Sequence, residues 1–136
     1  MLFVIFRREL VQIMTILCVD DHPVIVNGLK KSVERIYPEA TVLAFTVAKD
    51  ALFYAQSYGC DVLICEIELY NHGGITLAEQ IRCVNPYVNI IFVTVCSEQE
   101  HAKEVLKLRP SGYLTKPIIE SQLVAELHQL RYPVAN

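Results

Sequence analysis

The chain has 136 residues, a typical length for one domain and enough to bury a core without disulfides or a structural metal. Its formal net charge is −3, with acidic and basic residues mixed along the chain. The sequence therefore shows neither the basic block of a nucleic-acid-binding segment nor the acidic tail of a disordered one. Hydrophobic residues make up 53 % of the chain, a share that favours a sheet buried on both faces.

The N-terminal segment differs from the rest of the chain. Its apolar run, Leu2 to Phe6, ends at Arg7 and is too short for a membrane span; the segment also has no signal-peptide cleavage pattern. We expect residues 1–13 to be an extension, residues 14–133 the domain and residues 134–136 a tail. The extension is interpreted as the product of a misassigned start, since a second methionine, Met14, precedes the first clear strand. The alternative is a short amphipathic segment that packs on the domain or on a partner.

From Met14 onward, short apolar runs alternate with segments of helical period. In the first helical segment, apolar residues recur at three- and four-residue spacing after Pro23, a residue that suits a first helical turn. The second helical segment stops at Gly59. In chain order we expect strand 15–20, helix 23–37, strand 40–45, helix 47–58, strand 61–66, helix 75–84, strand 88–95, helix 98–108, strand 112–114 and helix 118–130. The alternation predicts an α/β fold with a parallel sheet, right-handed crossovers and helices on both sides.

The five cysteines form no CxxC pair, and three of them lie in or beside the apolar runs: Cys18, Cys65 and Cys96. This pattern predicts a reduced, cytoplasmic protein that uses cysteine as a small core residue. A redox or metal role for the cysteines is the alternative.

Polar residues stand where the predicted strands end. Asp20 and Asp21 follow the first strand, Glu66 ends the third, Thr94 ends the fourth and Lys116 follows the fifth. In such sheets functional residues collect at the carboxyl ends of the strands. Carboxylates bind a hard cation such as Mg²⁺, a hydroxyl and an ammonium contact phosphoryl oxygens, and a central carboxylate can be a nucleophile. Each residue alone suits a helix cap, a strand or a turn, so the signal is their joint placement.

Four stretches carry a family resemblance: "LCVDDHP", "DVLICEIELYNHGGI", "IIFVTVCSE" and "SGYLTKP". From Met14 to Tyr132 the chain resembles the receiver domain of two-component response regulators. "DDHPVIVNGLKKSV" is similar to receivers of the LuxR/NarL type, whereas the stretch from Asn89 to Ile118 is closer to the LytTR-associated type. The resemblance implies a flavodoxin-like (βα)5 fold, a doubly wound parallel sheet of strand order 2-1-3-4-5, and a signalling role rather than an enzyme.

The resemblance also implies a metal site. Asp20 and Asp21 match the acidic pair that carries Mg²⁺, and the backbone carbonyl of Glu68 matches a further ligand. Glu66 would add a carboxylate oxygen. We expect Mg²⁺ binding to be weak here, because the arm of Glu66 is long and the carboxylate competes for Lys116.

The implied switch consists of three residues. Thr94 matches the hydroxyl that moves onto a phosphoryl group, and Tyr113 matches the aromatic that rotates between exposed and buried positions. Lys116 matches the lysine that pairs with the phosphoacceptor, and its bond to Pro117 is typically cis in such domains.

Glu66 departs from the family pattern, because it stands where the family carries the phosphoaccepting aspartate. A glutamate carboxylate reaches about 1 Å further, and displacement of that size costs roughly a hundredfold in a positioned reaction. The longer arm also places an anion within reach of Lys116 and Thr94. Val95, in place of a small residue, is expected to crowd the site. Gly73 and Gly74 are expected to loosen the loop after the third strand.

We therefore predict an atypical receiver that is impaired in phosphorylation and acts through protein–protein contacts. In the resting protein Glu66 should pair with Lys116, and Tyr113 should lie at least partly inward. The alternative is a conventional phosphorylated, Mg²⁺-binding switch that regulates transcription through an output domain absent from this chain. A third class, an aspartate-based phosphatase or flavin carrier, is disfavoured because the chain lacks the Asp-x-Asp pair and the phosphate cradle those proteins need. A scaffold without switching is a further alternative.

The expected partners are a histidine kinase or another signalling protein, and a second copy of the chain. Receivers of this kind commonly pair through the fourth helix, fifth strand and fifth helix, here Glu98 to Leu108, Tyr113 and Ser121 to Leu130. That face mixes apolar and charged residues, as a partly polar interface does. No contact with a membrane, and no direct contact with nucleic acid by this domain, is expected.

Overall fold

The computed structural model describes residues 2–6, 9–70, 73–95 and 101–134, with only the backbone described for residues 2–6 and 9–12. Its strands are β1 (Leu2–Phe6), β2 (Glu9–Ile13), β3 (Thr15–Val19), β4 (Thr41–Phe45), β5 (Val62–Glu66), β6 (Asn89–Thr94) and β7 (Gly112–Thr115). Its helices are α1 (Pro23–Ile36), α2 (Ala48–Tyr58), α3 (Gly73–Val84), α4 (Ala102–Lys107) and α5 (Glu120–Leu127). Strands and helices alternate from Thr15 onward, as predicted.

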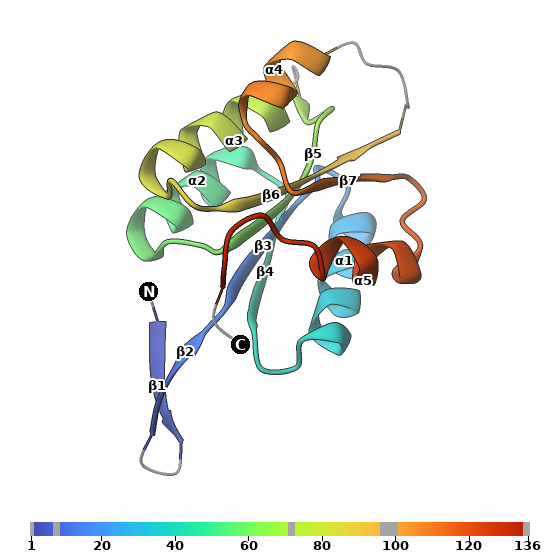
Figure 1. Cartoon of the computed structure of the whole chain (residues 1–136). Coiled ribbons are helices and arrows are strands. Elements are labelled where there is room, and N and C mark those ends of the chain that lie inside the picture. The colour runs from blue at the N-terminus through green and yellow to red at the C-terminus, as the bar shows by residue number, and fades with distance from the viewer. Residues whose placement is uncertain (1, 7–8, 71–72, 96–100, 135–136) are drawn as a thin grey trace.

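Strands β3 to β7 form one parallel sheet in the order β4-β3-β5-β6-β7 (Figure 1). Counted from β3, this is the order 2-1-3-4-5, so the flavodoxin-like doubly wound fold is confirmed. The central strand β3 pairs on both sides, and Leu17 lies opposite Leu43 of β4 and Leu63 of β5. All five strands run in the same direction, so their carboxyl ends meet at one edge of the sheet.

Alternate residues of the strands point to opposite faces of the sheet and form two apolar cores. Helices α2, α3 and α4 cover one face, and α1 and α5 cover the other (Figure 1). The central sheet residues of the first core are Leu17, Leu63 and Phe92, and those of the second are Ile16, Ile64 and Ile91. Among the described residues, every helix is too short or too polar to span a bilayer.

Two predicted helices begin later in the structure than the sequence pattern predicts. The helix predicted over 118–130 is confined to α5, because Ile119 has extended backbone angles of φ −99° and ψ 128° and cannot be its first turn. Of the helix predicted over 98–108, residues 98–100 lie outside the described residues, and α4 begins at Ala102. The loosening expected at Gly73 and Gly74 is wrong, since α3 begins at Gly73. A Cβ on Gly74 would overlap the Glu66 carbonyl oxygen, so glycine permits close packing there.

Residues 1–13 contain an element that the sequence analysis did not predict. Strands β1 and β2 pair antiparallel, with Leu2 opposite Ile13 and Phe6 opposite Glu9, and they form a sheet separate from the main one. The hairpin stands away from the body of the domain, and Met14 alone separates β2 from β3 (Figure 1). The division into an extension, a domain and a tail stays a prediction.

The described cysteines are free thiols, and three of the four are buried. Burial raises the pKa of Cys18 and of Cys60 to about 12, and it also raises the pKa of Cys65. Thiols with such pKa values are protonated and unreactive at neutral pH. The core role predicted for Cys18 and Cys65 is therefore confirmed, while Cys96 lies outside the described residues.

Candidate functional site

A lysine and two carboxylates meet at the carboxyl edge of the sheet. Asp20 follows β3, Glu66 ends β5 and Lys116 follows β7, so the fold brings together three residues far apart in sequence. Lys116 Nζ lies 2.7 Å from Asp20 Oδ2 and 2.5 Å from Glu66 Oε1. Both acids are buried, with 3 % of each residue exposed. The predicted contact between Glu66 and Lys116 is confirmed, and the Lys116–Pro117 peptide bond is cis.

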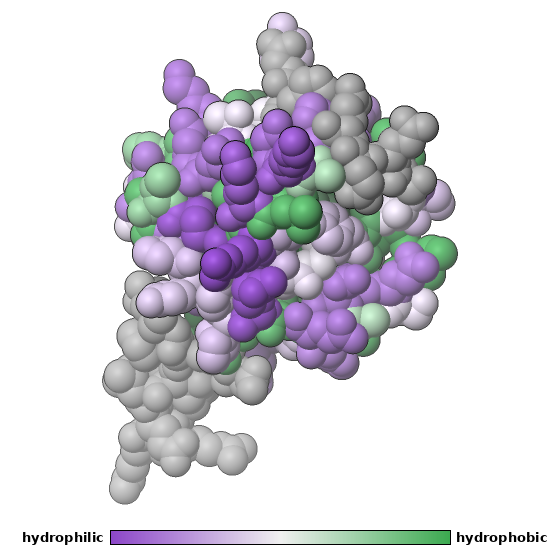
Figure 2. Space-filling model, turned by 45° about the horizontal axis from the view of Figure 1, so that its top comes forward, coloured by the Kyte–Doolittle hydropathy of each residue, from purple (hydrophilic) through white to green (hydrophobic). Residues whose placement is uncertain are grey.

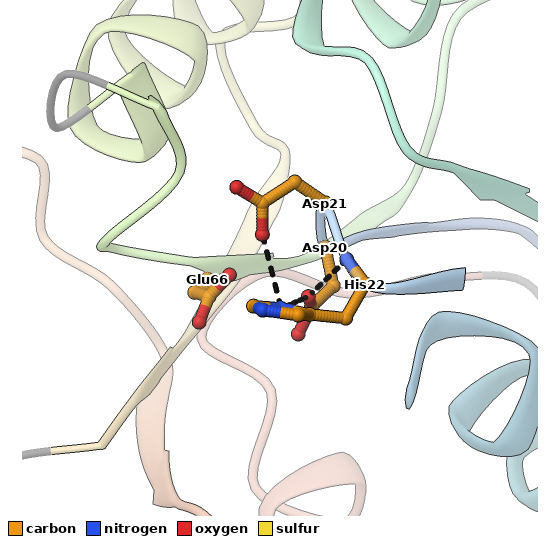
Figure 3. Close-up of side chains that lie close together, drawn as sticks. All are labelled: Asp20, Asp21, His22 and Glu66. Carbon is orange, nitrogen blue, oxygen red and sulfur yellow. Dashed lines mark hydrogen bonds and ion pairs between the residues drawn. The ribbon is translucent and has the colours of Figure 1, made fainter. Parts of the chain in front are cut away.

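The histidine after the acidic pair joins the same cluster. His22 Nδ1 lies 2.9 Å from Asp20 Oδ1 and 3.1 Å from Asp21 Oδ1, and its backbone N–H donates to Asp20 Oδ1 at 2.9 Å. Figure 3 shows the imidazole beside both carboxylates, with Glu66 near them. The hydrogen bond to Asp20 raises the pKa of His22. Sequence analysis missed His22, although an imidazole directly after two acids was a visible signal.

The two acids that share Lys116 have pKa values shifted in opposite directions. Burial favours the neutral form of Asp20, but hydrogen bonds from Lys116 and His22 outweigh it and lower the pKa of Asp20. For Glu66, burial is the largest effect and, with the nearby charge of Asp20, it raises the pKa despite the bond to Lys116. Burial also disfavours charged Lys116, yet its bonds to both acids raise its pKa. Asp20 is therefore the firmly ionised partner of Lys116, and Glu66 is the more easily protonated one.

Thr94 hydrogen-bonds to a residue that the sequence analysis had treated only as a backbone ligand. Its hydroxyl donates to Glu68 Oε1 at 2.6 Å. Glu68 lies two residues beyond the end of β5, and Thr94 ends β6, the strand that pairs with β5. The turn after β5 thus turns the side chain of Glu68 toward the hydroxyl.

Tyr113 lies at the surface, with 45 % of the residue exposed, so the inward position that we expected is not seen. Val95 is 60 % exposed, and crowding of the site by Val95 stays a prediction.

Hydrophilic residues gather across the carboxyl edge of the sheet, which Figure 2 brings toward the viewer.

The cluster has features that fit a divalent cation. Asp20, Asp21, His22 and Glu66 each offer one ligand atom, and these atoms all lie within 4.8 Å of one another. Glu66 Oε2 is buried without a hydrogen-bond partner among the described residues, and a cation would satisfy such an oxygen. Lys116, however, already neutralises one oxygen of Asp20 and one of Glu66. The donor set fits Mg²⁺, in competition with this ammonium group.

The chain is 26 % identical over 116 residues to the nitrate/nitrite response regulator protein NarL of Escherichia coli, a match covering 85 % of this chain and 53 % of NarL. Of the two types left open, the LuxR/NarL type is thus the one that a relative supports. The chain spans about half the length of the curated relatives it matches.

Many solved structures share the fold, and two of them illustrate the match. Chemotaxis protein CheY4 of Vibrio cholerae superposes with a TM-score of 0.78 at 21 % identity, covering 88 % of this chain and 99 % of CheY4. A response regulator protein from Burkholderia pseudomallei, with a phosphorylated aspartic acid, calcium ion and citrate, has a TM-score of 0.74 at 23 % identity; the match covers 84 % of this chain and 66 % of that chain. The family model of the response regulator receiver domain matches residues 16–128. The chain therefore belongs to the response regulator receiver domain family of two-component signalling.

Proposed function

We propose that the chain is an atypical receiver in which Glu66 pairs with Lys116 instead of accepting a phosphoryl group. One observation carries this proposal: Lys116 Nζ lies 2.5 Å from Glu66 Oε1 and 2.7 Å from Asp20 Oδ2. In a phosphorylated receiver this lysine would contact the phosphoryl group. Here a buried carboxylate at the acceptor position already holds it, through a charge-assisted bond worth about 1.5–3 kcal/mol before desolvation is subtracted.

A second internal contact supports the same proposal. The hydroxyl of Thr94, which the family resemblance assigns to the phosphoryl group, donates to Glu68. Two glutamates of the chain therefore accept hydrogen bonds from the two groups that would contact a phosphoryl oxygen. Glu66 carries one negative charge, against about two for a phosphoryl group, so the imitation is partial. Tyr113 is exposed, so in this partial imitation the aromatic side chain has not rotated to its buried position.

A conventional Mg²⁺-binding switch is the second candidate, and Glu66 Oε2 favours it, because this buried oxygen has no hydrogen-bond partner within the part of the chain that the structure describes. Carboxylates of Asp20, Asp21 and Glu66, with the backbone carbonyl of Glu68, are the groups that would hold the ion. A bound Mg²⁺ would neutralise charge on an incoming phosphoryl group. Lys116 would have to release its bonds to Asp20 and Glu66, so we propose that this binding is weak.

The proposed role is to transmit a signal through protein–protein contacts in the cytoplasm. The partners proposed are a histidine kinase or another signalling protein, and a second copy packed through α4, β7 and α5. Leu106 and Tyr113 support that face as an interface, because they are 66 % and 45 % exposed on it. An output domain that regulates transcription would lie outside this chain.

Intact mass spectrometry after incubation with Mg²⁺ and a small phosphodonor tests the proposal. The wild-type chain should keep its mass, because Glu66 is displaced as a nucleophile and Lys116 is engaged. The matched variant Glu66→Asp restores the shorter arm and should gain one phosphoryl group. A phosphoryl adduct on the wild type that disappears in Glu66→Gln would replace this proposal with the conventional switch.

A further inference from the structure

The N-terminal hairpin presents apolar residues on both of its faces. Residues directly opposite in an antiparallel pair share a face, and neighbours along a strand alternate between faces. The register places on one face Leu2, Val4, Phe6, Glu9, Val11 and Ile13, and on the other Phe3, Ile5, Leu10 and Gln12. Each face therefore holds a single polar position.

Such a hairpin needs a covering surface. An isolated two-stranded hairpin is marginally stable in water at best, and β1 has an open edge with unpaired backbone groups in its own sheet. Figure 1 shows the hairpin standing off the domain. The apolar residues of β1 and β2 therefore require a partner surface to be stably buried.

An apolar groove lies beside the point where the hairpin leaves the domain. The groove has a volume of about 570 Å³, and its lining includes Asp61, Val84, Tyr87, Val88, Tyr132 and Pro133. Asp61 Oδ2 accepts a hydrogen bond from the backbone N–H of Thr15 at 2.8 Å, and Thr15 follows β2 after one residue. The chain itself leaves Tyr87 and Val84 exposed at 74 % and 46 %.

The wall of the groove that Tyr132 forms is held in place by contacts within the chain. The side chain of Asn89, a fully buried residue, donates to the carbonyl of Tyr132 at 2.9 Å and accepts from its N–H at 2.7 Å. The Tyr132 ring stacks edge-on against Tyr87 at 5.6 Å, and Arg82 lies over it at 5.6 Å. A preformed wall saves the ordering free energy that binding otherwise requires.

We propose that the hairpin of one copy packs into this groove on a second copy, around a twofold axis. The projecting element and the groove lie at the same end of one chain, so a single twofold axis makes both contacts at once and closes the pair. The exposure of Tyr87 and Val84 shows that the chain's own hairpin does not cover the groove. Tyrosines at an apolar wall are also typical of the buried centre of protein interfaces.

This contact is separate from the signalling site. The groove lies at the amino edge of the sheet, since Asp61 and Val88 directly precede β5 and β6. It uses no residue of α4, β7 or α5. Self-association through the hairpin is therefore expected to be independent of Glu66 and of phosphorylation.

Sedimentation equilibrium of the full chain with point variants tests the contact. Ile5→Glu in the hairpin and Tyr87→Glu in the groove should each raise the dimer Kd about tenfold or more, because each places a charge in the contact. Phe53→Glu on α2 is the matched control, because Phe53 is exposed and lies outside both the groove and the α4, β7 and α5 face, and it should leave the dimer Kd unchanged. Tyr87 is mostly exposed, so its variant should keep the thermal stability of the wild type, which circular dichroism checks.

A mixed sample identifies the contact directly. In a mixture of isotope-labelled and unlabelled chains, NMR should detect nuclear Overhauser effects between the Tyr87 ring of one copy and the methyl groups of residues 2–13 of the other. A monomeric full chain, effects confined to one chain, or a dimer unchanged by both Ile5→Glu and Tyr87→Glu would each overturn the proposal.

Discussion

The two edges of the sheet hold their buried polar groups in different ways. At the carboxyl edge the groups are charged: Lys116 lies between Asp20 and Glu66, and Glu66 Oε2 is buried without a partner among the described residues. At the amino edge the fully buried polar side chain among the described residues is a neutral amide, Asn89, which both donates to and accepts from the backbone of Tyr132. The charged edge can respond to protons, cations or a changed charge, whereas the amide edge holds one fixed arrangement.

The largest effect is expected from removing the charge that neutralises the carboxyl edge. Lys116→Met should lower the free energy of unfolding by about 3–5 kcal/mol, because it removes the ammonium group that neutralises the two buried carboxylates of Asp20 and Glu66. Lys30→Met is the matched control; the Lys30–Glu34 pair is exposed, and its loss should change stability by about 0.5 kcal/mol or less. Urea denaturation at neutral pH measures both. If the two substitutions lowered the free energy of unfolding equally, burial would not be the reason why the Lys116 pairs stabilise the fold.

The amide edge should show an effect of intermediate size. Asn89→Ala removes the two hydrogen bonds between the Asn89 side chain and the backbone C=O and N–H of Tyr132. Losing them should lower the free energy of unfolding by about 1–3 kcal/mol. This loss should be the same at pH 5 and pH 8. Urea denaturation at the two pH values checks it, and a strong pH dependence would remove the contrast between the edges.

A smaller effect is expected from the hydrogen bond between Thr94 and Glu68. A double-mutant cycle with Thr94→Val and Glu68→Ala should give a coupling free energy of about 1 kcal/mol. Glu68→Gln is the matched control, since its side-chain oxygen can still accept the bond and most of the coupling should remain. A coupling of zero would mean that the two side chains are not joined in solution.

The smallest effect is a pH dependence at the carboxyl edge, and its sign follows from the pKa directions. The pKa of Glu66 is raised in the folded chain, so ionised Glu66 reduces stability at neutral pH, and this loss disappears as pH falls through its folded pKa. The pKa of Asp20 is lowered, so Asp20 adds stability above its unfolded pKa, which is lost as pH falls through its folded pKa.

Glu66→Gln isolates the first of these contributions. The stability of Glu66→Gln relative to the wild type should be highest at neutral pH and should decline as acid protonates Glu66 in the wild type. Asp20→Asn is the matched control, and its relative stability should change in the opposite direction, improving as pH falls. Urea denaturation at stepwise pH measures both. A relative stability of Glu66→Gln that rises on acidification would contradict the raised pKa.

Sequence pattern was sufficient for the fold because each strand is a short apolar run and each helix repeats its apolar residues at helical spacing. The parallel sheet then required Asp20, Glu66 and Lys116 to meet, and the arm length of glutamate indicated its contact with Lys116. The partner of Thr94 was not predictable in this way. It depends on how the turn after β5 directs the side chain of Glu68, which only the folded backbone decides.

The hairpin and the start of α5 escaped prediction for a related reason. The apolar run of five residues before Arg7 and Arg8 is too short for a membrane span. No pattern in the sequence indicated that residues 9–13 pair with it as a second strand. Ile118 and Ile119 fitted a helical apolar pattern, yet Ile119 is extended in the structure. At Ile119 the backbone direction therefore overrides local helix propensity.

NMR of the lysine ammonium group tests the contact between Lys116 and Glu66 most directly. A buried, hydrogen-bonded ammonium exchanges slowly enough to give its own nitrogen signal, and in the wild-type chain Lys116 Nζ should show one, coupled to the Glu66 carboxylate. In Glu66→Gln the coupling should vanish and the Lys116 signal should shift, while Lys30 stays unchanged. A Lys116 signal that is identical in the wild type and Glu66→Gln would show that Lys116 does not pair with Glu66 in solution.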